Sequence, residues 1–256
     1  LILSALILFL FRYRHQIRPL FSSKANLAFM LAATVLSFGI QRYTLNYLPF
    51  FDCLPYKKGN NINEQMKMPA NAIPDSTVIT FVYEKDGKLV KFTANEFPAD
   101  FSPTTYKLVN RYDKVIRKGK NNEPPIKGFV LSGIITSEDS TQVILSQPYS
   151  VLIFFENFSP PVSSWKKEME KVYKEARSRD IPVYLVTSRP DDAKEKIKGT
   201  VLQTLPLFKC DFTAVRTVAR TSPTIYILKN GTILGKWSYR QSGRVIDELK
   251  RMSTGR

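Results

Sequence analysis

Apolar residues concentrate in two runs near the start of the chain. Residues 1–11 are almost wholly apolar, and a second run over residues 25–40 extends to Leu48 before Pro49 ends it. The second run reaches the roughly 20 residues that an α-helix needs to cross a bilayer. Together the runs predict a transmembrane helical hairpin over residues 1–50, in which the first run is the trailing half of a helix that begins upstream. The alternative is a buried core helix.

The loop between the two runs, residues 12–24, is basic. It holds Arg12, Arg14, Arg18 and Lys24, and the positive-inside rule places such a loop in the cytoplasm. The long region after Phe51 then lies across the membrane. For a Gram-negative cell this means helices in the inner membrane and a domain in the periplasm.

Two polar residues, Gln41 and Arg42, interrupt the second run near its end. A charge within a membrane segment indicates a functional contact, for example with a proton or a quinone. Arg42 also lies late enough in the run to extend its guanidinium group to the outer headgroups. Both interpretations stay open, and the second is the simpler.

From residue 150 onward, short apolar strands alternate with amphipathic helices. A strand at 151–155 precedes a helix with Trp165 on its apolar face, for which Ser163 or Ser164 is the expected cap and Pro161 suits the first turn. Strands are also predicted at 182–187, 225–228 and 233–237, with Asn230-Gly231 as a type I′ turn, and helices at 191–198, 213–219 and 243–252. This order predicts an α/β layered domain over residues 126–256.

The region over residues 51–125 has a different pattern. Residues 77–83 and 89–93 flank Asp86-Gly87, which predicts a β-hairpin. The apolar residues of 106–118 follow helical spacing and predict an amphipathic helix. Residues 52–62 are rich in turn formers, so we expect them to lie along the membrane surface rather than form a helix, and 121–125 is the expected linker.

The strand and helix order, with Pro223 just before a strand, resembles the thioredoxin fold, in particular its membrane-tethered TlpA/ResA-type branch. Members of that family carry Cys-x-x-Cys where this chain has Ser159-Pro160-Pro161-Val162. The resemblance implies that Pro223 is cis and faces Ser159. It also implies a leading hairpin formed by 129–131 and 143–145. Serine cannot act as the attacking thiolate, so the dithiol chemistry is absent.

The charged residues narrow the function further. The chain has 38 Lys and Arg against 22 Asp and Glu, a net charge of +16, which favours contact with anionic lipid or an acidic partner. No nucleic-acid recognition module is evident.

The sole histidine, His15, lies in the basic loop, which leaves no imidazole for a catalytic triad or a typical metal site in the domain. Asp191-Asp192 suits a helix start better than a cation site. We therefore predict no cofactor and no metal.

Cys53 and Cys210 are the only cysteines. Their pairing would require Cα atoms within about 7 Å of each other, which the sequence does not indicate. Cys210 is expected to be a small buried apolar residue. Cys53 is the better candidate for a reactive or modified thiol.

Nearly the whole chain resembles bacterial DoxX-family membrane proteins that carry a thioredoxin-like C-terminal extension. The resemblance rests on the membrane hairpin and on three motifs: Leu48-Pro49-Phe50-Phe51-Asp52, Pro55-Tyr56-Lys57-x-Gly59-x-Asn61-Ile62 and Ile73-Pro74-Asp75-Ser76. It implies an envelope location and an association with quinone-linked redox processes. The expected domains are then membrane helices at 1–50, a juxtamembrane and β-hairpin region at 51–125, and a thioredoxin-like domain at 126–256.

The favoured hypothesis is a non-enzymatic module that binds an envelope protein or peptide. By resemblance, Ser222 and Pro223 would form a ledge for extended polypeptide, and Ser159, Pro160 and Trp165 its wall. One alternative is a DoxX-type quinone-linked oxidoreductase whose active groups lie upstream of Leu1. Another is single-thiol chemistry at Cys53 or Cys210.

Overall fold

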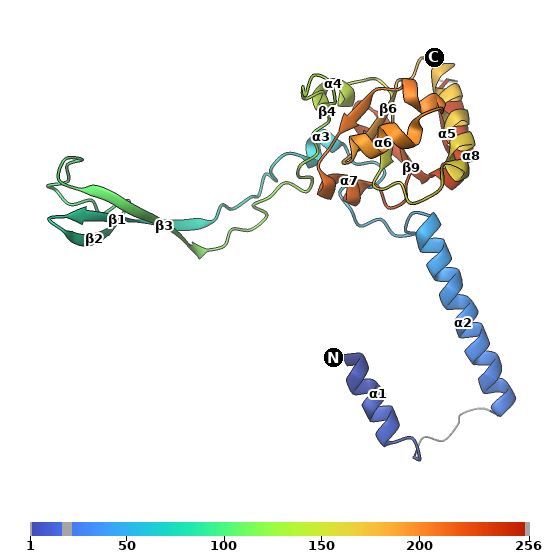
Figure 1. Ribbon diagram of the computed structural model, residues 1–256, viewed down its shortest axis with the longest axis horizontal. Helices are drawn as coiled ribbons and strands as arrows, with labels where there is room; N and C mark the ends of the chain where they lie inside the picture. The colour runs from blue at the N-terminus through green and yellow to red at the C-terminus, as the bar shows by residue number, and fades with distance from the viewer. Residues whose placement is uncertain (1, 17–21, 254–256) are drawn as a thin grey trace. The chain divides into compact units, whose positions relative to one another are not determined.

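The computed structural model describes residues 2–16 and 22–253. The chain divides into two compact units, Leu1–Leu48 and Pro49–Arg256, which are treated separately below (Figure 1). The first unit is helical. The second contains a small antiparallel sheet and an α/β domain.

The first unit holds helices α1 (Ile2–Arg12) and α2 (Ser23–Asn46). The side chain of Ser22 caps α2 by accepting the Ala25 N–H at 3.4 Å. The 24 residues of α2 rise about 36 Å, enough for a hydrocarbon core of roughly 30 Å. Among the described helices, α2 is the one that is long and apolar enough to cross a membrane, and none of its residues is buried.

One apolar helix that would serve as an anchor or as a signal sequence is thus present, whereas a two-span hairpin is not shown. Helix α1 has 11 described residues, which rise about 16 Å. Arg18 of the basic loop lies outside the described residues.

The end of α2 carries an aromatic pair. Tyr43 and Tyr47 stack with ring centroids 5.1 Å apart, and the Tyr43 hydroxyl donates to the Leu48 carbonyl at 3.1 Å. Gln41 and Arg42 are both exposed on this helix. Their position next to the tyrosines is where interfacial residues of a spanning helix lie.

The second unit begins with a three-stranded antiparallel sheet in the order β2-β1-β3. The strands are β1 (Ser76–Lys85), β2 (Lys88–Thr93) and β3 (Lys107–Arg117). The predicted hairpin is confirmed, with positive φ at Asp86 (50°) and Gly87 (73°), as a type I′ turn requires.

The predicted helix over 106–118 is wrong. Residues 107–117 form β3, which pairs with β1 from Ser76↔Arg117 to Glu84↔Lys107. The apolar spacing fits a helical stripe, but a helix would have nothing against which to bury it. Val109, Tyr112, Val115 and Ile116 favour a strand, and β1 offers the backbone partner.

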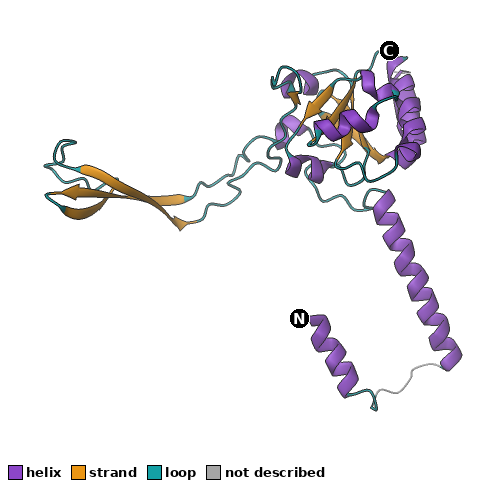
Figure 2. Cartoon of the chain, in the orientation of Figure 1, coloured by secondary structure: helices purple, strands orange, loops and turns teal. Residues whose placement is uncertain are grey.

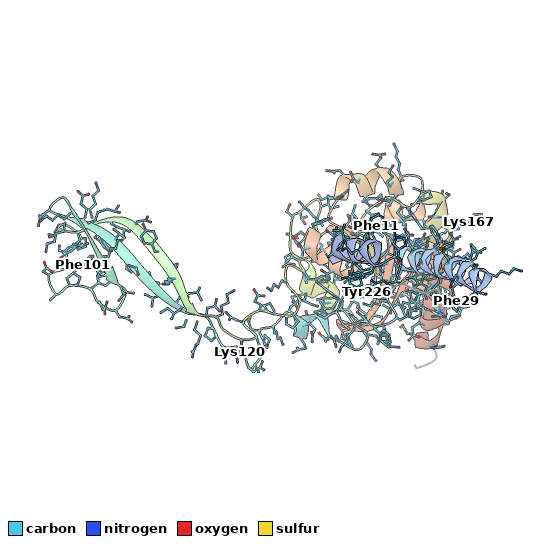
Figure 3. The ribbon with its side chains drawn as sticks, turned by 90° about the horizontal axis from the view of Figure 1, so that it is seen from below. Phe11, Phe29, Phe101, Lys120, Lys167 and Tyr226 are labelled. Carbon is cyan, nitrogen blue, oxygen red and sulfur yellow. The ribbon has the colours of Figure 1, made fainter. Side chains whose placement is uncertain are left out.

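An aromatic cluster packs on this sheet. Tyr83 lies 5.1 Å from Phe92 and 5.2 Å from Phe101 between ring centroids, and Phe97 lies 4.8 Å from Phe101. Phe101 is labelled at this sheet in Figure 3. The Tyr106 hydroxyl donates to Asp100 at 3.0 Å, and Lys85 pairs with the same carboxylate. These two donors lower the pKa of Asp100. The sheet therefore has a small core of its own.

The α/β domain is built on a six-stranded sheet in the order β4-β7-β6-β5-β8-β9 (Figure 2). The strands are β4 (Ser132–Gly133), β5 (Ser150–Phe155), β6 (Val183–Thr187), β7 (Leu207–Lys209), β8 (Thr224–Lys229) and β9 (Thr232–Ser238). Strands β5, β6 and β7 run parallel, while β8 and β9 run antiparallel to their neighbours. With helices on both faces, this is a thioredoxin-like fold.

The predicted helices after residue 160 are present. They are α5 (Val162–Arg177), α6 (Pro190–Ile197), α7 (Phe212–Val218) and α8 (Ser242–Ser253), and short helices lie at α3 (Ile62–Gln65), α4 (Thr141–Leu145), η1 (Val201–Thr204) and η2 (Tyr239–Gln241). All six residues of β5 are buried. Leu152 and Phe154 join the core beneath α7, while Val151, Ile153 and Phe155 join the core beneath α5 and α8. Burial on both faces explains the uninterrupted apolar run.

Two local predictions fail. Residues 143–145 belong to α4 rather than to a leading hairpin, and the strand before it is the two-residue β4. Asp139 sets the start of α4, because its carboxylate accepts hydrogen bonds from the Thr141 N–H at 2.9 Å and from the Thr141 hydroxyl at 2.5 Å. At α5 the N-cap is Pro161, without a side-chain cap, and Ser163 and Ser164 lie inside the helix.

Residues 52–62 form an integral part of the α/β domain. The sequence, from which we expected them to lie along the membrane surface, did not predict this packing. Tyr56 and Ile62 are 2% and 1% exposed within the core. The backbone pairs with β9 through Gly59 N–H to Ile233 O at 2.8 Å and Ile233 N–H to Asn60 O at 2.9 Å. Asp52 and Lys236 form an ion pair with an N–O distance of 2.5 Å, and the Lys236 side chain is only 9% exposed. This segment therefore covers the β9 edge of the sheet.

We expect Asp52→Asn to lower the free energy of unfolding by about 2–4 kcal/mol, because it leaves a buried ammonium group without its counter-charge. Both tryptophans, Trp165 and Trp237, lie in this domain. Urea denaturation of the detergent-solubilised chain, followed by tryptophan fluorescence, measures the change. The matched control is Asp191→Asn, whose ion pair is exposed and should contribute less than about 1 kcal/mol. Equal effects of the two substitutions would contradict a structural role for Asp52.

Candidate functional site

The loop between β5 and α5 occupies the position of the dithiol in thioredoxin-like oxidoreductases. Ser159 and Pro161 are exposed and Pro160 is half-buried. The Ser159 N–H donates to Asn157 Oδ1 at 3.1 Å, which closes an Asx-type turn before α5. Within residues 22–253 the Ser159 hydroxyl has no hydrogen-bond partner, so the structure supplies no base to activate it.

The Ser222–Pro223 peptide bond is cis, as the resemblance implied. The Ser222 hydroxyl accepts the Asn157 N–H at 3.3 Å and donates to the Asn157 carbonyl. Two loops that are 65 residues apart in sequence are therefore joined directly. Ser222 lies against the residue two positions before Ser159, so the cis-proline and the serine loop form one site.

The backbone N–H and C=O groups of Ser222 differ from those of its neighbours in their hydrogen bonding. Its neighbours are bonded, since Thr221 N–H donates to Thr224 Oγ1 at 3.2 Å and Tyr239 N–H donates to the Pro223 carbonyl at 3.2 Å. In the described part of the chain, the Ser222 N–H and C=O make no hydrogen bond. Ser222 is 6% exposed, so this donor and this acceptor are largely shielded from solvent. Such groups favour a partner that supplies main-chain hydrogen bonds.

Trp165 does not form a wall of this site. Its side chain is 1% exposed and contacts the Phe155 ring edge-on, with centroids 5.3 Å apart. It packs in the core beneath α5 because an indole on the apolar face of an amphipathic helix is buried against the sheet. Phe158, half-buried and stacked on Phe155 at 5.1 Å, is the aromatic residue of the loop itself.

Sequence reasoning missed Asn157, Phe158 and Thr187. The Thr187 hydroxyl donates to the Phe155 carbonyl at 2.8 Å and accepts the Arg189 N–H at 3.1 Å. It thereby fixes the carboxyl end of β5, from which the site loop begins. The signal for Asn157 was present, because an asparagine two residues before Ser-Pro is typical of an Asx turn.

The two thiols differ in environment. Cys210 is buried, its Sγ lies 3.8 Å from the Gly128 carbonyl, and burial raises the pKa of its thiol to about 11. The expected buried role of Cys210 fits this position. Cys53 is exposed, and the two cysteines are not joined.

The acidic pair at the start of α6 is held by ion pairs. Asp191 lies 3.8 Å from Lys194, and Asp192 lies 3.9 Å from Arg189. Among the residues that the structure describes, no group of three His, Cys, Asp or Glu side chains is placed to hold a metal ion.

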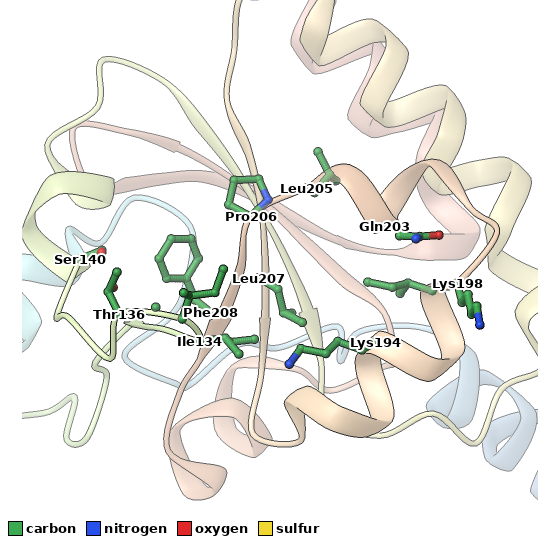
Figure 4. Close-up of a pocket in the computed structure, with 13 residues that line it drawn as sticks. Ile134, Thr136, Ser140, Lys194, Lys198, Gln203, Leu205, Pro206, Leu207 and Phe208 are labelled. Carbon is green, nitrogen blue, oxygen red and sulfur yellow. The ribbon is translucent and has the colours of Figure 1, made fainter.

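A cavity of about 620 Å³ lies between β7, α6 and the loop after β4 (Figure 4). Its walls are mainly apolar, and Lys194, Lys198 and Gln203 contribute polar groups. None of its lining residues comes from the Ser159 loop or the cis-proline loop. The cavity is therefore distinct from the candidate site.

Comparison with family models gives one match, a domain of unknown function (DUF8463) over residues 77–118. This range coincides with the β1–β3 sheet. No curated protein matches the chain.

Solved structures of thioredoxin-like proteins resemble the α/β domain at low identity. Yeast Sco1 is 13% identical, with a TM-score of 0.40, over 51% of this chain and 95% of Sco1. Sco1 of Thermus thermophilus is 17% identical, with a TM-score of 0.37, over 48% of this chain and 89% of that protein. The bacterioferritin comigratory protein of Xanthomonas campestris is 15% identical, with a TM-score of 0.36, over 48% of this chain and 90% of that protein. The fold assignment rests on the strand order and the cis-proline rather than on these scores, and DoxX membership is not shown.

We expect maleimide to modify Cys53 rapidly in the folded chain and Cys210 only after denaturation. The reason is that burial withholds the Cys210 thiol from reagent and its raised pKa keeps it protonated. Mass spectrometry of Cys53→Ser and Cys210→Ser variants, labelled between pH 7 and pH 9, separates the two sites. Rapid native-state labelling of Cys210 would contradict its burial in the folded chain.

Proposed function

We propose that the thioredoxin-like domain is a non-catalytic binding module for extended polypeptide, held at a membrane by α2. The observation that carries the proposal is the junction of Ser222 with Asn157. It retains the ledge-and-loop arrangement of the fold while the loop has serine in place of the attacking thiol.

The mode of binding follows from the backbone groups. A peptide in extended conformation aligned with residues 221–223 would accept the Ser222 N–H and donate to its carbonyl, as an added strand does. Ser159, Pro160 and Phe158 would flank it. Ser222 is 6% exposed and its hydroxyl is bonded to the Asn157 backbone. Binding at the Ser222 backbone therefore requires the Asn157 loop to move. Polypeptide recognised mainly through its backbone is the partner class that this site fits.

The membrane location is the second part of the proposal. The length and composition of α2 support an anchor, and exposed Phe50 (81%) and Phe51 (89%) follow it as aromatic residues do at membrane interfaces. Basic residues before α2, such as Arg12 and Arg14, support a cytoplasmic start and a domain in the periplasm, with α2 in the inner membrane.

The DoxX-type oxidoreductase alternative places its active groups upstream of Leu1, and no described residue favours it. Gln41 and Arg42 are exposed on α2 without a described partner that would indicate a quinone or proton site. The binding proposal is therefore preferred.

The test uses peptides selected against the purified full-length chain in detergent. We expect selected peptides to bind by their main chain, so N-methylation of one contacting amide should weaken binding about tenfold, in line with loss of one hydrogen bond. Fluorescence anisotropy measures the dissociation constants.

The matched variants lie on either side of α5, one in the loop before it and one at its C-cap. Ser159→Trp places a bulky side chain on the exposed site loop and should weaken peptide binding at least tenfold. Ser178→Trp, at the exposed C-terminal end of the helix, should leave binding unchanged. Selected peptides that bind Ser159→Trp as well as the wild-type chain would refute the proposed site.

A further inference from the structure

Strand β3 is a long, bare sheet edge. It lies at one side of the β2-β1-β3 sheet, and all 11 of its residues are exposed. Leu108, Val109, Tyr112 and Ile116 each expose more than half of their surface. Edge strands of this length with apolar side chains pair with further strands unless the protein blocks them.

The centre of β3 is self-complementary about Tyr112. When the strand is paired antiparallel with a copy of itself, the central positions on either side of this tyrosine are complementary, because Arg111 meets Asp113. Farther out, Val109 meets Val115 and Leu108 meets Ile116. At the two ends, beyond the register shifts, Lys107 meets Arg117 with like charge. Opposite-charge and apolar cross-strand pairs stabilise a sheet, and like charges destabilise it.

The charges favour a twofold axis at Tyr112 over an axis at either neighbouring residue. A twofold axis at residue 111 would place Arg111 opposite Arg111, and an axis at residue 113 would place Asp113 opposite Asp113. With the axis at Tyr112, both Arg111–Asp113 pairs are favourable. Within one chain the same groups already pair, with Arg111 Nε 2.9 Å from Asp113 Oδ1, so both side chains lie on one face of the strand.

The backbone is compatible with this register. The Arg111 N–H donates to Asn110 Oδ1 at 2.8 Å, which indicates that it is turned away from β1. Pairing with a second copy would replace this bond with one to Asp113 of that copy. Because alternate residues of a strand direct these groups to the same side, Arg111 and Asp113 both present N–H and C=O groups at the free edge. They would form hydrogen-bonded pairs, and Tyr112 would meet Tyr112 as a non-hydrogen-bonded pair.

The irregular parts of β3 lie outside the centre of this pairing. Residues 110–115 pair regularly with 77–82, and the register shifts occur on either side of that stretch. The central positions 110–114 therefore have undistorted strand geometry. Bulges at the flanks limit how far the pairing extends.

We propose that two copies of this chain associate through antiparallel pairing of their β3 strands about a twofold axis at Tyr112. The interface is isologous, so each Arg111 meets Asp113 of the second copy and the assembly closes as a dimer. The interface concerns residues 107–117 and does not depend on the function proposed for the Ser222 ledge.

The decisive experiment uses two single charge reversals of the full-length chain in detergent. Arg111→Asp gives a strand with two acidic residues at the interface, and Asp113→Arg gives one with two basic residues. Analytical ultracentrifugation should show a dissociation constant raised about 10- to 100-fold for each variant alone, because two like-charge pairs replace two opposite-charge pairs. A mixture of the two variants should form heterodimers with near wild-type affinity.

The mixture distinguishes pairing between copies from an effect on the folding of one copy. Each variant lacks the Arg111–Asp113 ion pair within its own chain, so only pairing between copies explains recovery of the dimer in the mixture. A matched control is Lys171→Glu on α5, which breaks the exposed ion pair with Glu168 and should leave the dimer unchanged. A wild-type chain that stays monomeric at about 100 μM would overturn the proposal. So would a dimer that both reversals leave intact, or one in which the mixture fails to associate.

The register has its own test in a Cys53→Ser background. Opposed residues of a non-hydrogen-bonded pair have Cα atoms about 4.5 Å apart, within the range of a disulfide. Tyr112→Cys should therefore form a disulfide dimer under mild oxidation. Lys114→Cys, which faces Asn110 of the second copy, should not. Equal cross-linking of the two variants, or cross-linking of Lys114→Cys alone, would refute the register and point to another partner for the strand.

Discussion

Two hydrogen bonds between the Ser222 hydroxyl and the backbone of Asn157 hold the functional end of the α/β domain together. They join the cis-proline loop to the loop that leads into α5. Thr187 supports the same loop from below through the Phe155 carbonyl. The result is a site whose closed form in the structure is held by serine, threonine and asparagine. Its loop has Ser159 in place of the attacking thiol, and the Asn157 loop must move for a peptide to reach the Ser222 backbone. This arrangement is the physical basis of the binding proposal.

The two sheets of the second unit differ in how far their edge strands are covered. In the six-stranded sheet, backbone bonds from residues 59–62 cover β9, and the other edge is the two-residue β4. In the three-stranded sheet, β3 presents 11 exposed residues. Proteins generally shorten, charge or cover their edges to prevent unwanted pairing. Strand β3 also carries five charged residues and a register shift toward each end. The opposite charges of Arg111 and Asp113 at its centre are the feature on which the proposed association with a second copy rests.

The sequence predicted the α/β elements well because each had a strong local signal. The apolar run 151–155, the amphipathic face of Trp165 and the Asn230-Gly231 turn all fixed their own structure. The segment 106–118 failed because its apolar spacing suits helix and strand alike, and only the tertiary partner β1 decides between them. Trp165 was placed correctly on its helix and wrongly in the site, since burial depends on packing. The Ser222–Asn157 junction spans 65 residues, and no local pattern records such a contact. The fit of residues 52–62 against β9 was hidden for the same reason.

Hydrogen–deuterium exchange on the full-length chain, with and without a selected peptide, most directly tests whether the Ser222 ledge is the recognition site. Backbone pairing at the ledge predicts that the peptide slows exchange at residues 220–224 and changes it at 156–161 as the Asn157 loop moves aside. The cavity beside α6 should show no change. Protection confined to residues 194–208, with none at the ledge, would mean that the peptide binds elsewhere and would contradict the assignment.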